Sequence, residues 1–163
     1  MTNAELGIPE YKVRKKSTKK SYRKPESIKA FQKEHMVQKY LGRNIPASCH
    51  IETPFDDKTA NGLTRLIIAW MGMHGHFAAR INSGAVYDRR LGIYRKGSGA
   101  TAGMADVNAV MGGKSVSIEV KIGKDKIRES QLKVKAQIEQ AGGVYIIVRS
   151  FDDFLQQIEE INK

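Results

Sequence analysis

The sequence has little cysteine and no long apolar segment, and both absences limit what the protein can be. Its single cysteine, Cys49, excludes an internal disulfide framework and suits a reducing compartment, so we expect a cytoplasmic protein. No apolar run approaches the ~20 residues of a membrane-spanning helix, and we find no signal-peptide pattern. We therefore expect no membrane partner. At 163 residues with 40% hydrophobic content, the chain is long enough for one globular domain and short for two.

Acidic residues are scarce relative to basic ones. The chain has 28 Lys and Arg against 17 Asp and Glu, a net charge of +11. Residues 12–24 hold eight basic residues and no acid, without apolar periodicity, so we expect residues 1–24 to form a disordered basic arm. A basic arm on a basic domain indicates a polyanionic partner, most simply nucleic acid. An arm that only keeps the chain soluble would have the same composition. The arm residues expected to bind phosphates are Lys15, Lys16, Lys19 and Lys20.

Residues 103–121, GMADVNAVMGGKSVSIEVK, predict a β-hairpin. Apolar and polar residues alternate on both sides of the glycine pair 112–113, and two-residue hairpin turns favour glycine because they need positive φ. With these glycines as the loop, Asp106 faces Glu119 across the two strands. Lys121, two residues beyond Glu119, returns to the same face. The hairpin is therefore expected to gather two carboxylates and one ammonium group.

The expected cluster has the composition of a phosphodiester hydrolysis site. Two carboxylates side by side repel each other, and a divalent cation would reverse that interaction. Hard oxygen ligands that leave room for water and phosphate oxygens suit Mg²⁺ or Mn²⁺. A lysine beside them can orient a metal-bound water or stabilise charge on a phosphate. The alternative is a surface hairpin whose acids merely face each other.

The pattern of Asp106 followed by Glu119-x-Lys121 resembles the PD-(D/E)xK nuclease superfamily. GMAD, then SIEVK, then Gln131 at the start of an expected helix, is similar to its VRR-NUC branch, over roughly residues 61–154. The resemblance implies an α/β, restriction-endonuclease-like core with a four-stranded mixed sheet flanked by helices. It also implies that Asp106 and Glu119 hold Mg²⁺ or Mn²⁺, that Lys121 positions the attacking water and that Gln131 helps to orient it.

The same resemblance implies a class of substrate. Small stand-alone VRR-NUC proteins, often carried by viruses or mobile elements, resemble junction resolvases, so we expect a bacterial or viral protein that cleaves branched DNA. Four-way junctions are the leading candidate, and their two symmetric cuts would need a C₂ homodimer. The chain has no obvious base-reading module, so it should recognise shape. Two alternatives stay open: a DNA-binding module that retains the nuclease fold without cutting, and a ribonuclease.

The resemblance departs in the helix before the first strand. Family members usually place a glutamate there as a further metal ligand, and the matching position is near Asn61, in a helix (59–74) without any acid. An amide can ligate a cation but contributes no charge. The missing ligand could come from Glu52, Asp56 or Asp57, or from the other subunit of a dimer.

Hydrophobic periodicity and helix-capping residues place the remaining elements. We expect helices at 26–41, 59–74, 128–141 and 151–161, and strands at 77–81 and 144–148. The first helix either packs on the core or extends a DNA-binding surface. The expected organisation is a basic arm (1–24), an N-terminal helix and loop (25–58) and a nuclease-like domain (59–163).

The glycine-rich segment 84–103 is expected to be a long loop that contacts DNA. Glycine lets the backbone approach a ligand, basic side chains suit phosphates, and Tyr87 and Tyr94 offer stacking surfaces. An Arg-x-Asn segment resembling one in VRR-NUC sequences precedes it. The residues of this region expected to bind nucleic acid are Arg80, Asn82, Arg89, Arg90, Arg95 and Lys96.

Overall fold

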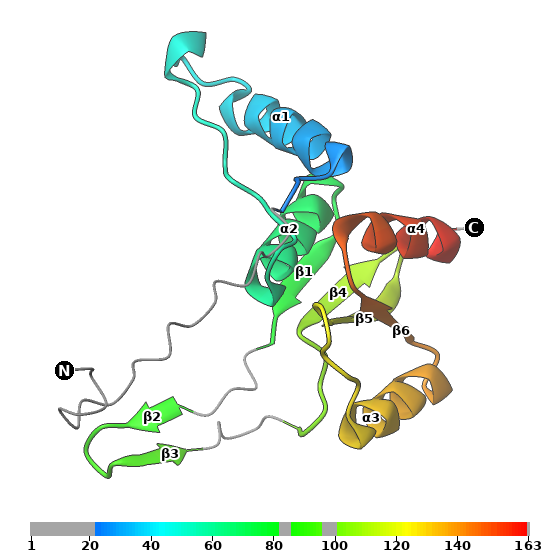
Figure 1. Cartoon of the computed structure of the whole chain (residues 1–163). Helices are drawn as coiled ribbons and strands as arrows, with labels where there is room; N and C mark the ends of the chain where they lie inside the picture. The colour runs from blue at the N-terminus through cyan, green and yellow to red at the C-terminus, as the bar shows by residue number, and fades with distance from the viewer. Residues whose placement is uncertain (1–21, 82–85, 96–100, 163) are drawn as a thin grey trace, which may run out of the picture.

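A four-stranded sheet lies at the centre of the chain, as the computed structural model shows for residues 22–81, 86–95 and 101–162 (Figure 1). Its strands, in spatial order, are β1 (Phe77–Arg80), β4 (Val107–Met111), β5 (Lys114–Val120) and β6 (Val144–Val148). β1 and β4 are antiparallel, as are β4 and β5, whereas β5 and β6 are parallel. The predicted four-stranded mixed sheet is therefore confirmed.

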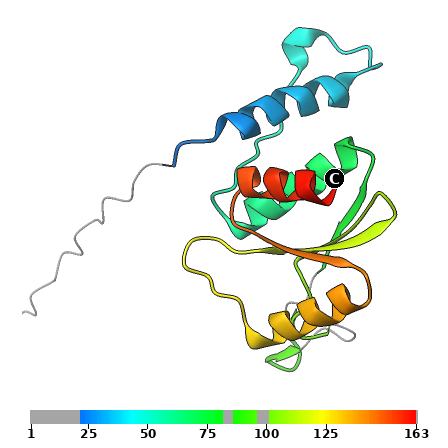
Figure 2. The same ribbon diagram turned by 90° about the vertical axis from the view of Figure 1, so that its right-hand side faces the viewer.

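Helices cover both faces of this sheet (Figure 2). The helices are α1 (Glu26–Tyr40), α2 (Ala60–Met73), α3 (Glu129–Gln140) and α4 (Phe151–Ile161), with a short 3₁₀ helix, η1 (Ala47–Cys49), after α1. α2 and α4 lie on one face and α3 lies on the other. All four predicted helices and both predicted outer strands are confirmed, and their ends differ from the predicted ones by at most one residue.

The larger core fills the space between the sheet and the pair α2 and α4, where side chains such as Leu66 and Ile118 are completely buried. It extends outward to α1, because Ile28 and Phe31 of that helix are also buried against it. The sequence left two roles open for the first helix. Packing on the core is confirmed for the face of α1 that carries Ile28 and Phe31. A smaller cluster, built around Tyr145, lies between the sheet and α3.

The segment predicted to be a long loop contains a second, two-stranded sheet. Its strands are β2 (Val86–Asp88) and β3 (Ile93–Arg95), which pair antiparallel. The loop prediction was wrong for these residues, because the surrounding glycines and arginines obscured two strands of only three residues each. Residues 1–21 of the predicted basic arm lie outside the described residues, as do Asn82 and Lys96.

No helix in the described ranges is both long and apolar enough to cross a bilayer.

Candidate active site

The β4–β5 hairpin has the register that the glycine turn predicts. Met111 pairs with Lys114 and Val107 pairs with Ile118, which places Asp106 opposite Glu119 one step beyond. Val107 and Ile118 belong to the larger core, so the alternate residues, including Asp106 and Glu119, are directed to the α3 side of the sheet. The predicted meeting of the two acids is therefore confirmed.

Backbone hydrogen bonds continue one residue past the strands and hold the site at one end of the sheet. The amide of Ile81 donates to the carbonyl of Asp106 at 2.8 Å, and the amide of Lys121 donates to the carbonyl of Val148 at 2.9 Å. Asp106 is thereby held between β1 and β5, and Lys121, which directly follows β5, is held to β6. The positions of these side chains are therefore set by the hydrogen bonds of the sheet and not by a loop.

Glu119 is the centre of the cluster. Glu119 and Lys121 are each only 3% exposed. Lys121 Nζ lies 2.9 Å from Glu119 Oε1. The same oxygen accepts a hydrogen bond from Gln131 Nε2 at 2.5 Å. Glu119 Oε2 accepts from the hydroxyl of Tyr145 at 3.5 Å. A buried carboxylate is thus surrounded by three donors.

Gln131 joins helix α3 to the site through both ends of its amide. Its Oε1 accepts from the amide of Arg128, which caps the first turn of α3, at 2.9 Å. Its Nε2 donates to Glu119. Gln131 therefore stabilises the start of α3 and also contacts the carboxylate of the site.

Asp106 lies beside Glu119 and is only half-buried. Its Oδ2 accepts from the amide of Val120 at 2.9 Å, which lays the carboxylate against β5. Burial raises the pKa of Glu119, and the negative charge of Asp106 raises it further, while Lys121 and Gln131 oppose this shift. The pair of acids therefore holds negative charge that its protein neighbours only partly compensate.

These residues fit a divalent cation that keeps much of its hydration. Asp106 and Glu119 supply two hard oxygen donors, and the half-buried Asp106 leaves a side open to solvent. Across the described parts of the chain, no three His, Cys, Asp or Glu side chains are grouped to hold a metal. A cation here would thus need water or phosphate oxygens for its other positions, which is how Mg²⁺ is usually held.

Two neighbours of the site were missed in the sequence. Tyr145 lies beside Ser117 in the parallel β5–β6 register, and burial, together with the charge of Glu119, raises the pKa of its hydroxyl. Asp125 Oδ2 lies 3.4 Å from Lys121 Nζ, in the turn between β5 and α3. The one sequence signal for Tyr145 was a polar-tipped ring in an otherwise aliphatic strand.

The position of the missing helix acid is occupied by a different interaction. Asn61 Oδ1, in the first turn of α2, accepts from Arg80 Nη2 at 2.7 Å. Each of the three acids considered as substitutes accepts a hydrogen bond from another part of the protein. Glu52 accepts from Gln32, Asp56 from the amide of Lys58, and Asp57 from the amide of Phe151 and the hydroxyl of Tyr22.

The basic residues predicted to bind nucleic acid are only partly described. Arg89 and Arg90 are exposed in the turn between β2 and β3, and Arg80 is exposed at the end of β1. The side chain of Arg95 and the remaining predicted residues lie outside the description: Asn82, Lys96, Lys15, Lys16, Lys19 and Lys20.

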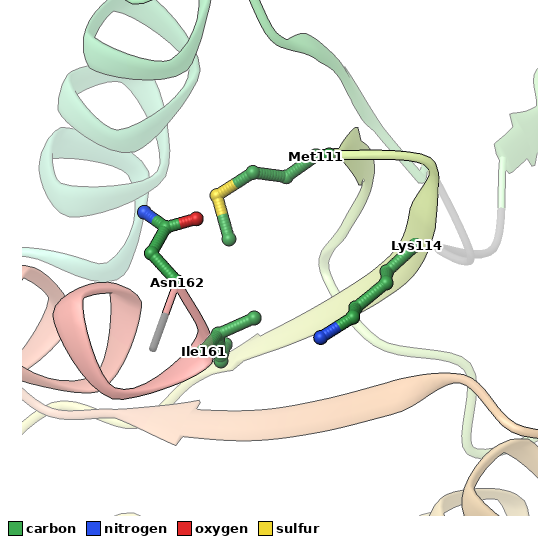
Figure 3. Close-up of a pocket in the computed structure, with 5 residues that line it drawn as sticks. Met111, Lys114, Ile161 and Asn162 are labelled. Carbon is green, nitrogen blue, oxygen red and sulfur yellow. The ribbon is translucent and has the colours of Figure 1, made fainter.

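A surface pocket of about 180 Å³ lies at the opposite end of the sheet (Figure 3). It is lined by Met111, Gly112 and Lys114 at the hairpin turn and by Ile161 and Asn162 at the end of α4. None of the predicted site residues lines it, so the candidate site is the carboxylate cluster and not this pocket.

Gly103 supports the site through a close backbone contact, which leads to a first prediction. Its φ is +92°, and a Cβ there would collide with the Ser130 carbonyl at the start of α3. We expect Gly103→Ala to lower the free energy of unfolding by about 2 kcal/mol or more, from left-handed strain plus overpacking. Gly142→Ala is the matched control, because Gly142 has φ +83° but open space around it. Urea denaturation of both variants measures the difference, and equal losses would contradict the close contact.

Comparison of the chain with known protein families, curated proteins and solved structures finds no match.

Proposed function

We propose that this chain is a metal-dependent endonuclease that hydrolyses phosphodiester bonds in branched DNA. The observation that carries the proposal is the cluster of Asp106, Glu119 and Lys121 on one face and at one end of the sheet. The resemblance of these residues and Gln131 to the VRR-NUC pattern supports the same conclusion, as does the net charge of +11.

Asp106 and Glu119 would hold Mg²⁺ or Mn²⁺. Such a cation, when bound, polarises the scissile phosphate and lowers the pKa of its water. The protein's own contribution is orientation. Gln131 fixes the Glu119 carboxylate from α3, and the buried Lys121 is held in place by Glu119 on one side and Asp125 on the other.

Lys121 has a donor to spare for the reaction. An ammonium group carries three N–H donors, and the described residues engage Nζ through two carboxylates. The third donor can bind the attacking water or a non-bridging phosphate oxygen. A preorganised cation at that position stabilises charge that develops in the transition state.

Shape recognition and a homodimer complete the proposal. A single site makes one cut, whereas a four-way junction needs two symmetric cuts, which a C₂ pair of chains would provide. The basic arm would add affinity without sequence preference, because phosphate contacts position a protein but do not read bases.

The test is cleavage of a panel of labelled DNAs: linear duplex, single strand, flap, splayed arm and four-way junction. We expect cleavage with Mg²⁺ or Mn²⁺ and none with EDTA, and branched substrates cut at least about tenfold faster than duplex, a difference of about 1.4 kcal/mol. Light scattering gives the mass of the active species. Equal cutting of duplex and junction by a monomer would reduce the proposal to a general nuclease.

One observation favours a second candidate, a DNA-binding module that does not cut. Asn61 stands where the family usually has an acid, and its amide is already bound to Arg80. Calorimetric titration with Mn²⁺ separates the two functions. DNA binding without metal uptake or turnover would establish the module and exclude the nuclease.

A further inference from the structure

The β2–β3 hairpin stands apart from the rest of the described chain. Its two strands pair only with each other, and neither contacts another described helix or strand. Figure 1 shows the hairpin projecting away from the central sheet. Isolated two-stranded hairpins are marginally stable in water, and the strands of this hairpin do not pack on the core of the described chain.

The hairpin presents a pair of tyrosines to solvent. Tyr87 and Tyr94 are directly opposed across the two strands, with ring centroids 5.0 Å apart and planes inclined at 53°. The residues are 50% and 73% exposed. Leu91 and Ile93, on the same hairpin, are also about half exposed. Apolar and aromatic surface of this kind, held on a projecting element, indicates an interaction surface.

The charge of the hairpin indicates the partner. Residues 86–95 contain three arginines and one acid, Asp88. The Asp88 carboxylate accepts from the amides of Arg90 and Leu91 and so shapes the turn. Arg89 and Arg90 are exposed beside the tyrosine pair. A second copy of the same basic hairpin would be repelled, whereas a polyanion with flat rings matches both features.

We propose that the Tyr87–Tyr94 pair stacks on unpaired nucleobases while Arg89 and Arg90 bind the adjacent phosphates. This inference rests on the proposed function. Among the branched DNAs of its panel, it favours those with a single-stranded segment at the branch, such as a splayed arm or flap, over the fully paired four-way junction. Stacking of a base on an aromatic side chain tolerates every base, because each has a π face. The hairpin then recognises the shape of the branched DNA, and no base-reading module is needed.

The test measures stacking directly, in EDTA, so that it needs neither metal nor cleavage. A splayed-arm DNA carries 2-aminopurine in its single-stranded arm, and stacking quenches the fluorescence of that base. The variant Tyr87→Leu/Tyr94→Leu removes the rings, and Tyr87→Phe/Tyr94→Phe retains them. Phe77→Leu is a matched control, because Phe77 is an exposed aromatic residue (64%) on β1, outside the hairpin.

We expect the parent, the phenylalanine variant and Phe77→Leu to quench 2-aminopurine and to bind the splayed arm alike. The leucine variant should lose the quenching and bind the splayed arm roughly tenfold or more weakly, while its affinity for linear duplex changes by less than about twofold. Unchanged duplex affinity also shows that the variant is folded. Quenching that persists in the leucine variant, or an equal loss in Phe77→Leu, would overturn the inference.

The two proposals fail in different ways. Tyrosine-dependent quenching in a protein that never cleaves DNA leaves this inference standing and removes the nuclease. Cleavage by a leucine variant that binds the splayed arm as tightly as the parent removes the inference and leaves the nuclease. A leucine variant that changes from dimer to monomer by light scattering, with quenching retained, identifies the hairpin as a contact between copies and also overturns the inference.

Discussion

Replacing Lys121 with methionine is expected to lower the free energy of unfolding by about 3–5 kcal/mol. Lys121 and Glu119 are both almost fully buried, and their charged atoms are 2.9 Å apart. Removing the lysine leaves Glu119 as an uncompensated buried charge, which costs more than the pair contributes. Urea denaturation at neutral pH measures the loss.

A double-mutant cycle separates this charge effect from lost packing. In Glu119→Gln/Lys121→Met neither buried group is charged, so we expect most of the lost stability to return. Lys133→Met is the matched control, because Lys133 forms a comparable 2.8 Å pair with Glu129, but both side chains are over 70% exposed. It should cost at most about 0.5 kcal/mol. Equal losses for Lys121→Met and Lys133→Met would show that burial of the pair is unimportant.

The loss in Lys121→Met should also depend on pH. The pKa of Glu119 is already raised by burial, and removing the lysine takes away a group that lowers it. A folded state with a raised carboxyl pKa binds more protons than the unfolded state, so stability falls as pH rises through the interval between the two pKa values. The destabilisation by Lys121→Met should therefore be larger at pH 8 than at pH 5.

The sequence predicted the central hairpin well because its determinants are local. A glycine pair fixes the turn. A slip by one residue would turn every apolar side chain of β5 away from the larger core to the face that holds Glu119, so the alternation leaves one register. That register alone placed Asp106 opposite Glu119. Helix ends were equally local, as Ser150 shows by accepting from the amide of Asp153 at the start of α4.

Contacts between distant segments could not be predicted in the same way. Tyr145 reaches Glu119 only because β6 pairs in parallel with β5, a register set by the crossover through α3 and not by any turn. The bond between Asn61 and Arg80 joins a helix to the end of the next strand. The sequence marked Asn61 as a missing acid but gave no sign of its partner.

The β2–β3 hairpin shows a different limit. Its strands have three residues each and bury no face against the core, so neither length nor alternation separates them from a loop. The prediction of a DNA contact came from arginines and tyrosines, which composition alone identifies. The strand pairing adds the geometry that brings Tyr87 and Tyr94 together.

Replacing Asp106 with asparagine is expected to reduce Mg²⁺-dependent cleavage by at least about 10²–10³-fold in kcat, the range seen when one preorganised electrostatic group is removed. The change removes a ligand charge but keeps a side-chain oxygen that can still accept from the amide of Val120. Asp106 is half-buried and has no buried cation as partner in the described structure, so the fold should survive. Single-turnover cleavage, with denaturation as the check on folding, measures the effect.

DNA binding without metal gives the second half of this test. Asp106→Asn should lower cleavage but should not lower the affinity for DNA in EDTA. In EDTA, Asp106 and Glu119 place negative charge, only partly compensated by Lys121, where a phosphate would lie, so Asp106→Asn should bind DNA as tightly as the parent or more tightly. Asp125→Asn is the matched control: this acid also lies near Lys121 but is half exposed, so cleavage should fall far less. A protein in which Asp106→Asn cuts as fast as the parent has its metal site elsewhere. One in which cleavage and metal-free binding fall together uses Asp106 to hold DNA or the fold, and not to hold a cation.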